Sequence, residues 1–280
     1  MAAMLRAVEH IRRVRGGSQA QVMRADDGHD YITKMQGNPQ DTRILANELL
    51  ACRLARLIGL PVPEPVVIEV DDATIRQQLI TFTLAGRNVM PHAGPQFGSR
   101  LVTDDQVFDF FPDSLLSRVR GLRMFAGILA FDKWTANADG RQVVFHKRNR
   151  ARTWHIQFID FGYCFNASEW SFPDAPLRGT YARNNVYDDI SGWNDFEPWL
   201  SRIEHFPEKT LFAAAEDIPT EWYAYREDLD RLLTTLLERR SRVRDLVDSF
   251  RLSARCPFRN WGLACPISAA ARPSAASLTL

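Results

Sequence analysis

The 280-residue sequence lacks the features that would place it in a membrane, in a secretory route or on nucleic acid. Its longest apolar run, residues 124–131, is far shorter than the ~20 residues that cross a bilayer. The N-terminal residues lack the apolar core of a secretory signal peptide. The formal net charge of +1 shows no basic footprint for nucleic acid. These absences indicate a cytoplasmic protein with no membrane span and no nucleic-acid partner.

Cysteine and histidine are also scarce. Cys52, Cys164, Cys256 and Cys265 contain no CxxC spacing, so we expect reduced thiols, with a Cys256–Cys265 pair as the alternative. The six histidines are scattered without ligand spacing, which argues against a zinc site. The sequence has no GxSxG, and therefore offers no support for nucleophilic hydrolysis. It has neither a Walker A loop nor GxGxxG.

Lysine is the rarest charged residue: arginine supplies most of the 35 basic side chains, and the lysines are Lys34, Lys133, Lys147 and Lys209. Lys34 lies near the end of the third of three short strands that we expect at residues 8–15, 20–25 and 30–35. Gly16-Gly17-Ser18-Gln19 forms the turn between the first two. This pattern fits a loop that covers phosphates, with Lys34 below it. It also fits a plain antiparallel meander with an exposed lysine.

A helix is predicted over residues 43–58, ended by Gly59 and the prolines that follow. Glu48 on this helix is either a solvated glutamate or a partner of Lys34. Strands at residues 66–70 and 77–83 would complete a five-stranded sheet, and residues 84–98 would form a hinge. Further helices are expected over residues 108–131, broken at Pro112, and over residues 228–252. The Ala/Ser/Pro-rich end, from residue 267, predicts disorder.

The most informative stretch is residues 130–165. It contains a loop with Asn137, Asp139 and Gln142, then two short strands joined by a basic turn, and finally Asp160-Phe161-Gly162. Mg²⁺ prefers oxygen ligands and is commonly held by one or two carboxylates together with substrate phosphates. Phosphoryl transfer also needs a carboxylate that accepts the proton of the attacking hydroxyl. The two aspartates at the ends of this hairpin therefore suit a metal–phosphate site.

Five motifs together resemble the bacterial HipA-like kinase family: GGSQ at 16–19, YITK at 31–34, NELLACRLARLIGLPVPEP at 47–65, FDKWTANADGRQ at 131–142 and FIDFG at 158–162. The likeness extends from about residue 8 to about residue 250. It implies an α+β, two-lobed protein-kinase-like fold. The small lobe, residues 1–85, would hold an antiparallel sheet and one helix. The large lobe, residues 86–255, would be mainly helical with a catalytic β-hairpin, and residues 256–280 would be a disordered tail.

The resemblance also implies roles for individual residues. Lys34 would hold ATP phosphates and Glu48 would orient it, beneath the loop of Gly16, Gly17, Ser18 and Gln19. Asp139 would accept the hydroxyl proton, with Asn137 and Arg141 in the same catalytic loop. Asp160 would be the main Mg²⁺ ligand, and Gln142 would serve as a second ligand. Many kinases have a metal-binding Asn five residues after the catalytic Asp, where this sequence has Val144. Asp132, which precedes this loop, is expected either to cap the preceding helix or to brace the loop.

These features predict an ATP- and Mg²⁺-dependent phosphotransferase that transfers the γ-phosphoryl group to a hydroxyl, with a protein serine or threonine as the first expectation. Two alternatives remain. Val144 favours a nucleotide-binding pseudokinase with a regulatory role. The Asp139 and Ile-Asp-Phe-Gly pattern also fits a small-molecule or lipid phosphotransferase, although that group usually has His where this chain has Asn137. The sequence does not identify the acceptor.

Overall fold

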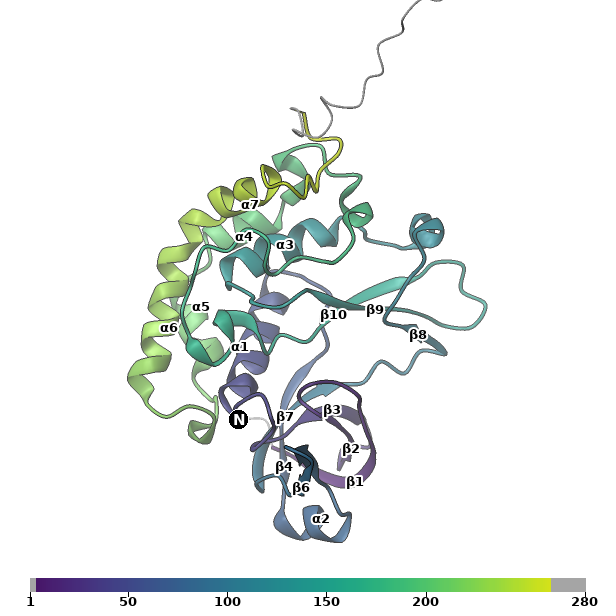
Figure 1. The fold of residues 1–280 in the computed structure, drawn as a ribbon, viewed down its shortest axis with the longest axis vertical. Helices are drawn as coiled ribbons and strands as arrows, with labels where there is room; N and C mark the ends of the chain where they lie inside the picture. The colour runs from purple at the N-terminus through teal and green to yellow at the C-terminus, as the bar shows by residue number, and fades with distance from the viewer. Residues whose placement is uncertain (1–3, 263–280) are drawn as a thin grey trace, which may run out of the picture.

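The computed structural model describes residues 4–262, and a β-barrel forms one end of the molecule while helices form the other (Figure 1). The disorder expected from residue 267 lies outside the described residues, as does Cys265 of the alternative cysteine pair. Cys52 and Cys164 are free, buried thiols. No described helix has the length and apolar character needed to cross a membrane.

Five strands close the barrel in the order β1 (Leu5–Arg13), β2 (Gln21–Ala25), β3 (Asp30–Lys34), β7 (Gly94–Arg100) and β4 (Pro65–Val70). Four neighbouring pairs are antiparallel, but β1 and β4 close the barrel in parallel. An antiparallel sheet was expected, but the barrel is mixed because of this one parallel pair. Alternate residues of the strands fill the barrel, because side chains along a strand point to opposite faces. The interior side chains include Met23, Tyr31, Ile68 and Val70.

The fifth strand is not the segment expected from the sequence. Residues 77–83 instead end helix α2 (Asp72–Gln77) and begin β5 (Phe82–Leu84), which pairs only with β6 (Arg87–Val89) in a separate hairpin. The hinge expected at residues 84–98 is wrong, because β7 lies between β3 and β4. Gly98 suits this position, since a Cβ there would lie 2.5 Å from Ile68 Cδ1 and would force that side chain to move. A division that follows strand pairing would fall after Arg100 rather than at residue 85.

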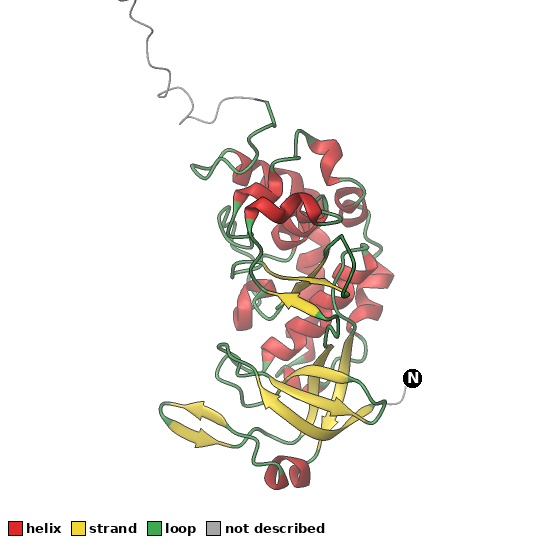
Figure 2. Cartoon of the chain, turned by 90° about the vertical axis from the view of Figure 1, so that its right-hand side faces the viewer, coloured by secondary structure: helices red, strands yellow, loops and turns green. Residues whose placement is uncertain are grey.

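Helix α1 (Arg43–Leu57) forms as expected and lies between the barrel and the helical end of the molecule (Figure 1). Figure 2 shows the same division into a strand-rich part and a helix-rich part. Eleven of its 15 residues are buried, so it is covered on nearly every side. It contacts β4 and β7 on one side and α5 (Glu208–Ala215) on the other. At its C-terminus, Arg202 donates to the carbonyl of Ile58 at 2.7 Å. Helix α1 therefore contacts both halves of the molecule.

The second half of the chain combines a small sheet with helices. Strands β9 (Gln142–Lys147) and β10 (His155–Ile159) form the expected hairpin, and β8 (Gln106–Phe108) adds a third strand. Helix α3 (Met124–Trp134) is shorter than expected, and a 3-10 turn, η1 (Asp113–Arg118), precedes it. The helix expected at residues 228–252 is two helices, α6 (Arg226–Arg239) and α7 (Val243–Arg251). The remaining elements are η2 (Cys164–Glu169), η3 (Asn184–Tyr187), η4 (Trp193–Phe196), α4 (Trp199–Glu204), η5 (Thr220–Trp222) and η6 (Arg240–Arg242).

Helix α3 is the centre of the helical core, and all its residues from Phe125 to Trp134 are buried. It contacts α4 and α7, and its C-terminal end leads directly into the loop that carries Asp139. Close approach to α4 depends on Gly127. A Cβ at this position would lie 2.4–2.8 Å from three atoms of the Trp199 indole ring. Packing of α3 thus fixes where the following loop begins.

We predict that Gly127→Ala destabilises the fold although alanine is the better helix former. The gain in helix propensity, about 1 kcal/mol, is smaller than the cost of overpacking, about 1 to 3 kcal/mol. Urea denaturation should show a net loss of about 1 kcal/mol. Gly192→Ala is the matched control, because Gly192 has extended backbone and open space around its Cα. Equal stability of Gly127→Ala and the wild type would contradict the packing argument.

Candidate functional site

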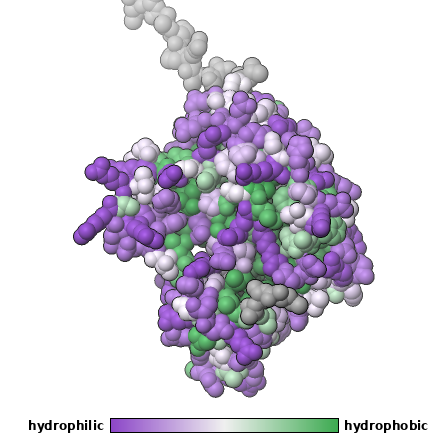
Figure 3. All heavy atoms as spheres, turned by 180° about the vertical axis from the view of Figure 1, so that it is seen from behind, coloured by the Kyte–Doolittle hydropathy of each residue, from purple (hydrophilic) through white to green (hydrophobic). Residues whose placement is uncertain are grey.

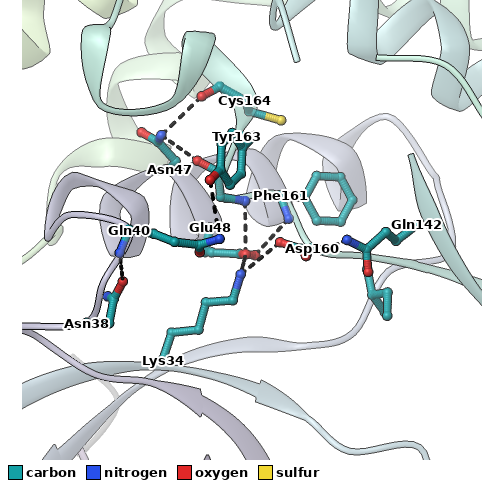
Figure 4. A network of polar contacts seen from close by, with 12 residues as sticks. Lys34, Asn38, Gln40, Asn47, Glu48, Gln142, Asp160, Phe161, Tyr163 and Cys164 are labelled. Carbon is teal, nitrogen blue, oxygen red and sulfur yellow. Dashed lines mark hydrogen bonds and ion pairs between the residues drawn. The ribbon is translucent and has the colours of Figure 1, made fainter. Parts of the chain in front are cut away.

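Three segments that are distant in sequence meet at one ammonium group (Figure 4). Lys34 ends β3, Glu48 lies in the middle of α1, and Asp160 directly follows β10. Lys34 Nζ donates to Glu48 Oε1 at 2.5 Å and to Asp160 Oδ1 at 2.8 Å. Lys34 is 6% exposed and Glu48 is 2% exposed, so the solvated alternatives for both side chains are excluded. The expected Lys34–Glu48 pair is present.

Glu48 also holds the backbone after Asp160. Its Oε2 accepts from the Phe161 amide at 3.0 Å, and its Oε1 accepts from the Gly162 amide at 2.9 Å. Glycine is required at 162, because a Cβ there would lie 2.5 Å from Ile44 Cγ2. Asn47, the residue before Glu48, donates to the carbonyls of Gly162 and Cys164. Helix α1 therefore fixes both Lys34 and the Asp160-Phe161-Gly162 segment.

The charges at this contact are unequal: one ammonium faces two carboxylates. Burial disfavours the Lys34 ammonium, but Glu48 and Asp160 outweigh burial and raise the pKa of Lys34. Burial also acts against the Asp160 carboxylate, but Lys34 and Arg141 outweigh it and lower the pKa of Asp160. Burial raises the pKa of Glu48, with Asp160 adding to the shift and Lys34 opposing it. Two carboxyl groups thus share one ammonium, and their oxygen atoms are ligands of the kind that a hard cation prefers.

Asp160 is the residue best placed to hold that cation. Its backbone has φ +61, a left-handed conformation that non-glycine residues rarely adopt. Its Oδ2 accepts from Gln142 Nε2 at 2.7 Å, which places the amide of Gln142 beside the carboxylate. A carboxylate and an amide carbonyl are both oxygen ligands that suit Mg²⁺. The residues present therefore fit a hard divalent cation between Asp160 and Gln142.

A buried ion pair supports the strained Asp160 backbone from behind. Arg141 donates to Asp132 through Nε at 3.0 Å and Nη2 at 2.6 Å, and both side chains are almost fully buried. Arg141 Nη1 donates to the carbonyls of Ile159 at 2.8 Å and Asp160 at 3.1 Å. Its guanidinium also lies 4.2 Å from the centre of the Phe161 ring. Burial opposes the guanidinium charge, but Asp132 outweighs it and raises the pKa of Arg141.

This network changes the roles expected for three residues. Arg141 was expected in a catalytic role, but its donors are used inside the protein, so it positions Asp160. Asp132 braces the loop, which confirms one of the two structural roles expected for it. Asn137 is 3% exposed and donates to Asp132 Oδ1 at 3.0 Å, while its own Oδ1 accepts from the Asp139 amide at 3.1 Å. Asn137 therefore shapes the loop that presents Asp139.

Asp139 lies in the loop between α3 and β9 and is exposed. Its Oδ1 accepts from the Gly140 amide at 2.7 Å, and its carbonyl accepts from the Gly179 amide at 3.1 Å. Gly179 has φ +61 and lies so close to Asn137 that a Cβ would meet its carbonyl oxygen at 3.0 Å. The backbone of the loop is thus held on both sides of Asp139, whose carboxylate is exposed.

The glycine-containing turn between β1 and β2 does not act as one unit. Gln19 was expected to help bind a nucleotide, but its amide pairs with the Thr83 backbone, with two contacts of 2.8 Å. It therefore anchors the turn to the β5–β6 hairpin. Gly16 and Gly17 are exposed, Ser18 is buried, and Gly17 lies against Gln40 of the loop before α1.

Val144 lies within β9 opposite Gln157, as expected of a strand residue, and Gln142 is opposite Ile159.

Comparison with known proteins identifies the family of this chain. Residues 7–246 match the family described as HipA-like kinase. The chain belongs to the HipA-like kinase family. Membership places it among kinase-type phosphotransferases. Among curated proteins, no sequence matches this chain.

Two solved structures show that this HipA-like chain has a kinase-like α+β fold. The proinflammatory kinase CtkA of Helicobacter pylori is 12% identical with a TM-score of 0.59, and the match covers 90% of this chain and all of CtkA. The Golgi casein kinase with Mn/ADP bound is 10% identical with a TM-score of 0.51, covering 90% of this chain and 74% of that one. At such identities, the similarity concerns the fold alone.

Sequence reasoning gave no role to Lys133, which anchors the segment beside Asp139 in this HipA-like protein. Lys133 Nζ donates to the carbonyls of Pro176 at 2.7 Å and Arg178 at 2.6 Å, immediately before Gly179. Burial lowers the pKa of Lys133 to about 8, and Asp132 only partly opposes the shift. Neutral lysine still has two N–H donors for these two carbonyls. Only its position after Asp132 could have suggested this role.

We predict that removing the Asp132 carboxylate strongly destabilises this member of the family. Asp132→Ala leaves the Arg141 charge buried without its partner, which typically costs about 3 to 5 kcal/mol. Urea denaturation of Asp132→Ala, Arg141→Met and the double variant measures the coupling between them. We expect the double variant to lose clearly less than the sum of the single losses. Additive losses would show that the pair is not an energetic unit.

Lys133 predicts a specific dependence of stability on pH. Its pKa is lower in the folded chain than the ordinary 10.5, so between pH 8 and 10.5 the unfolded chain binds the extra proton. The free energy of unfolding therefore rises with pH in this window, by at most about 1.4 kcal/mol per pH unit from this group. Other groups titrate nearby, so the measurement is the difference between wild type and Lys133→Met. Parallel stability curves for the two proteins would contradict the assignment.

Proposed function

We propose that this HipA-like chain is an ATP- and Mg²⁺-dependent phosphotransferase that transfers the γ-phosphoryl group to a hydroxyl, with a protein serine or threonine as the first acceptor class. The contact of Lys34 with both Glu48 and Asp160 is the observation that carries the proposal. A phosphate-binding lysine, the carboxylate that orients it and a metal-binding aspartate have to be close together for phosphoryl transfer. Here they share one buried hydrogen-bond cluster.

The proposed lobes follow the fold. The barrel with α1 would be the nucleotide-binding lobe, and the chain from β8 to residue 255 would be the catalytic lobe. Seen from behind in Figure 3, the surface is hollowed near the level where the barrel meets the helical part, with polar and apolar side chains around the hollow. Lys34 reaches this junction from the barrel, and Asp160 reaches it from the β9–β10 hairpin. A nucleotide would therefore bind between the lobes.

Lys34 would hold the α- and β-phosphates, and Glu48 would keep its ammonium directed at them. Asp160 and Gln142 would hold Mg²⁺. The ion would offset the negative charge that develops on the phosphates and on the leaving group during transfer. Gln142 can present its carbonyl oxygen by rotating the amide, which exchanges the positions of its nitrogen and oxygen. The two carboxyl groups at Lys34 supply oxygen atoms of the kind that a hard cation prefers.

Asp139 would orient the acceptor hydroxyl and accept its proton. Its backbone is held by Asn137 and by Gly179, and its exposed carboxylate is accessible to an acceptor. Such positioning can contribute strongly to phosphoryl transfer, because little covalent chemistry is left to the protein. The oxygen of the hydroxyl would attack the γ-phosphorus, and its proton would pass to Asp139 as ADP leaves.

A catalytically weak nucleotide-binding module is the second candidate, favoured by two observations. Val144 occupies the strand position where many kinases have a metal-binding Asn. In addition, Lys34 and Gln142 already contact both carboxylate oxygens of Asp160. A cation would have to displace at least one of these donors. This arrangement would give binding without efficient turnover.

Transfer of label from γ-labelled ATP tests the two candidates. With Mg²⁺, the wild type should label itself, lysate proteins or lipids, and the labelled species identifies the acceptor class. Asp139→Asn should lower transfer by a factor of about 100 or more while ATP affinity stays within about twofold, because Asp139 acts on the acceptor. Asp160→Ala should abolish the Mg²⁺-dependent step. The exposed variant Gln77→Ala is the control and should keep full transfer.

The other outcomes are equally informative. ATP bound by the wild type without any transfer would favour the regulatory module. Loss of ATP binding in a folded Asp139→Asn protein would contradict the role given to Asp139. Circular dichroism of each variant separates such losses from unfolding.

A further inference from the structure

A glutamine connects the turn between β1 and β2 with the segment after Asp160-Phe161-Gly162. Gln40 lies in the loop between β3 and α1, and its side chain extends toward Tyr163 (Figure 4). Its Nε2 donates to the Tyr163 hydroxyl at 3.3 Å. On its other side, the amide lies against Gly17, where a Cβ would approach Nε2 to 2.8 Å. We call Gly17, Gln40 and Tyr163 the Gln40 bridge.

The base of the bridge is rigid. Asn38 Oδ1 accepts from the backbone N–H of Gln40 at 2.8 Å, and Asn38 Nδ2 donates to the Met35 carbonyl at 2.8 Å. Asn38 itself is buried. The loop that carries Gln40 therefore starts one residue after Lys34 and keeps its shape through its own side-chain contacts. Movement of Gln40 is limited mainly to its side chain.

The far end of the bridge is tied to the catalytic loop. The Tyr163 carbonyl accepts from the Ala138 amide at 2.9 Å, and Ala138 lies between Asn137 and Asp139. Tyr163 also directly follows Gly162, whose amide is held by Glu48. Gln40 thus connects the glycine-containing turn to the same backbone that positions Asp139 and Asp160.

The amide of Gln40 has one unused group. Its Oε1 is buried and has no hydrogen-bond partner among the described residues. A buried amide group without a partner is unfavourable, and such groups usually find one. The Tyr163 hydroxyl can either donate or accept, so the amide can rotate and leave Nε2 free instead.

We propose that Gln40 is a positioning residue that holds the glycine-containing turn closed over the nucleotide phosphates, an inference that rests on the proposed function. Gly17 without a side chain lets the turn approach the amide, and Tyr163 fixes the amide from the other side. Gln19 anchors the opposite flank of the turn to Thr83. Closure by Gln40 therefore favours nucleotide retention and acts on the phosphates, not on the base.

Nucleotide affinity separates this role from a general effect on folding. Affinities for ATP and adenosine are measured by displacement of a fluorescent nucleotide for wild type, Gln40→Ala, Tyr163→Phe and the double variant, with Gln77→Ala as control. We expect Gln40→Ala to weaken ATP binding by about three- to tenfold, the equivalent of one hydrogen bond. Adenosine affinity should stay unchanged, because adenosine has no phosphates. In the transfer assay, KM for ATP should rise while kcat falls less than twofold.

Coupling and exchange provide two further readouts. The double variant should bind ATP no more weakly than Gln40→Ala alone, because both substitutions break the same bridge. In protein without nucleotide, backbone amides of residues 16–19 should exchange faster in Gln40→Ala than in wild type or Gln77→Ala. Gly17→Ala should show the same pattern, because its methyl group displaces the Gln40 amide.

Three results would overturn the inference: unchanged ATP affinity in Gln40→Ala, an equal loss for ATP and adenosine, or fully additive losses in the double variant. Each of these leaves the proposed function standing, provided that the wild type binds and transfers phosphate. If the wild type binds neither ATP nor adenosine, the proposed function fails and the inference fails with it.

Discussion

The site depends on the hydrogen bonds that the Lys34 ammonium donates to Glu48 and Asp160. The ammonium joins the barrel, through β3, to helix α1 through Glu48 and to the β9–β10 hairpin through Asp160. Burying these charges is costly, and the cost is offset only because each carboxylate has further donors. Glu48 accepts from two backbone amides, and Asp160 accepts from Gln142. These shared contacts hold β3, α1 and the segment after β10 together at one point.

A second buried ion pair also fixes the backbone at Asp160. Arg141 and Asp132 lie behind Asp160, and Arg141 donates to the carbonyls that flank the strained residue. An apolar pair of similar size would fill this space with less desolvation cost. It would not supply donors to two carbonyls at a backbone with φ +61. The ion pair is therefore explained by the position it imposes on Asp160, and its contribution to stability is secondary.

The sequence predicted the local elements and chemistry better than it predicted the sheet topology. The first three strands, α1 and the β9–β10 hairpin follow from alternation, capping and spacing, which are local properties. Strand β7 was missed because Gly94, Pro95 and Gly98 resemble a loop when considered locally. Gly98 is needed by Ile68 of a neighbouring strand, a contact that no local pattern contains. Tertiary packing outweighs local propensity at such positions.

The site residues show the same division. Lys34, Glu48 and Asp160 were found because a family resemblance fixed their identities, and the structure brings them together. Arg141 and Gln19 were given site roles by the same resemblance, as members of the catalytic loop and of the glycine-containing turn. Their side chains point elsewhere, to Asp132 and to Thr83. Neighbours in sequence leave a turn or loop in different directions, so proximity along the chain is weak evidence for proximity to a ligand.

The state of Asp160 connects binding to catalysis in the proposed mechanism. In the structure, its two oxygens are used by Lys34 and Gln142, so a cation has to replace at least one donor. Lys34 retains Glu48 when it releases Asp160, and Gln142 can rotate its amide to become a ligand itself. Neither replacement strands a buried charge. The pairing seen here therefore satisfies the site before a metal binds, and it also leaves each partner able to change roles once the phosphates bring the metal in.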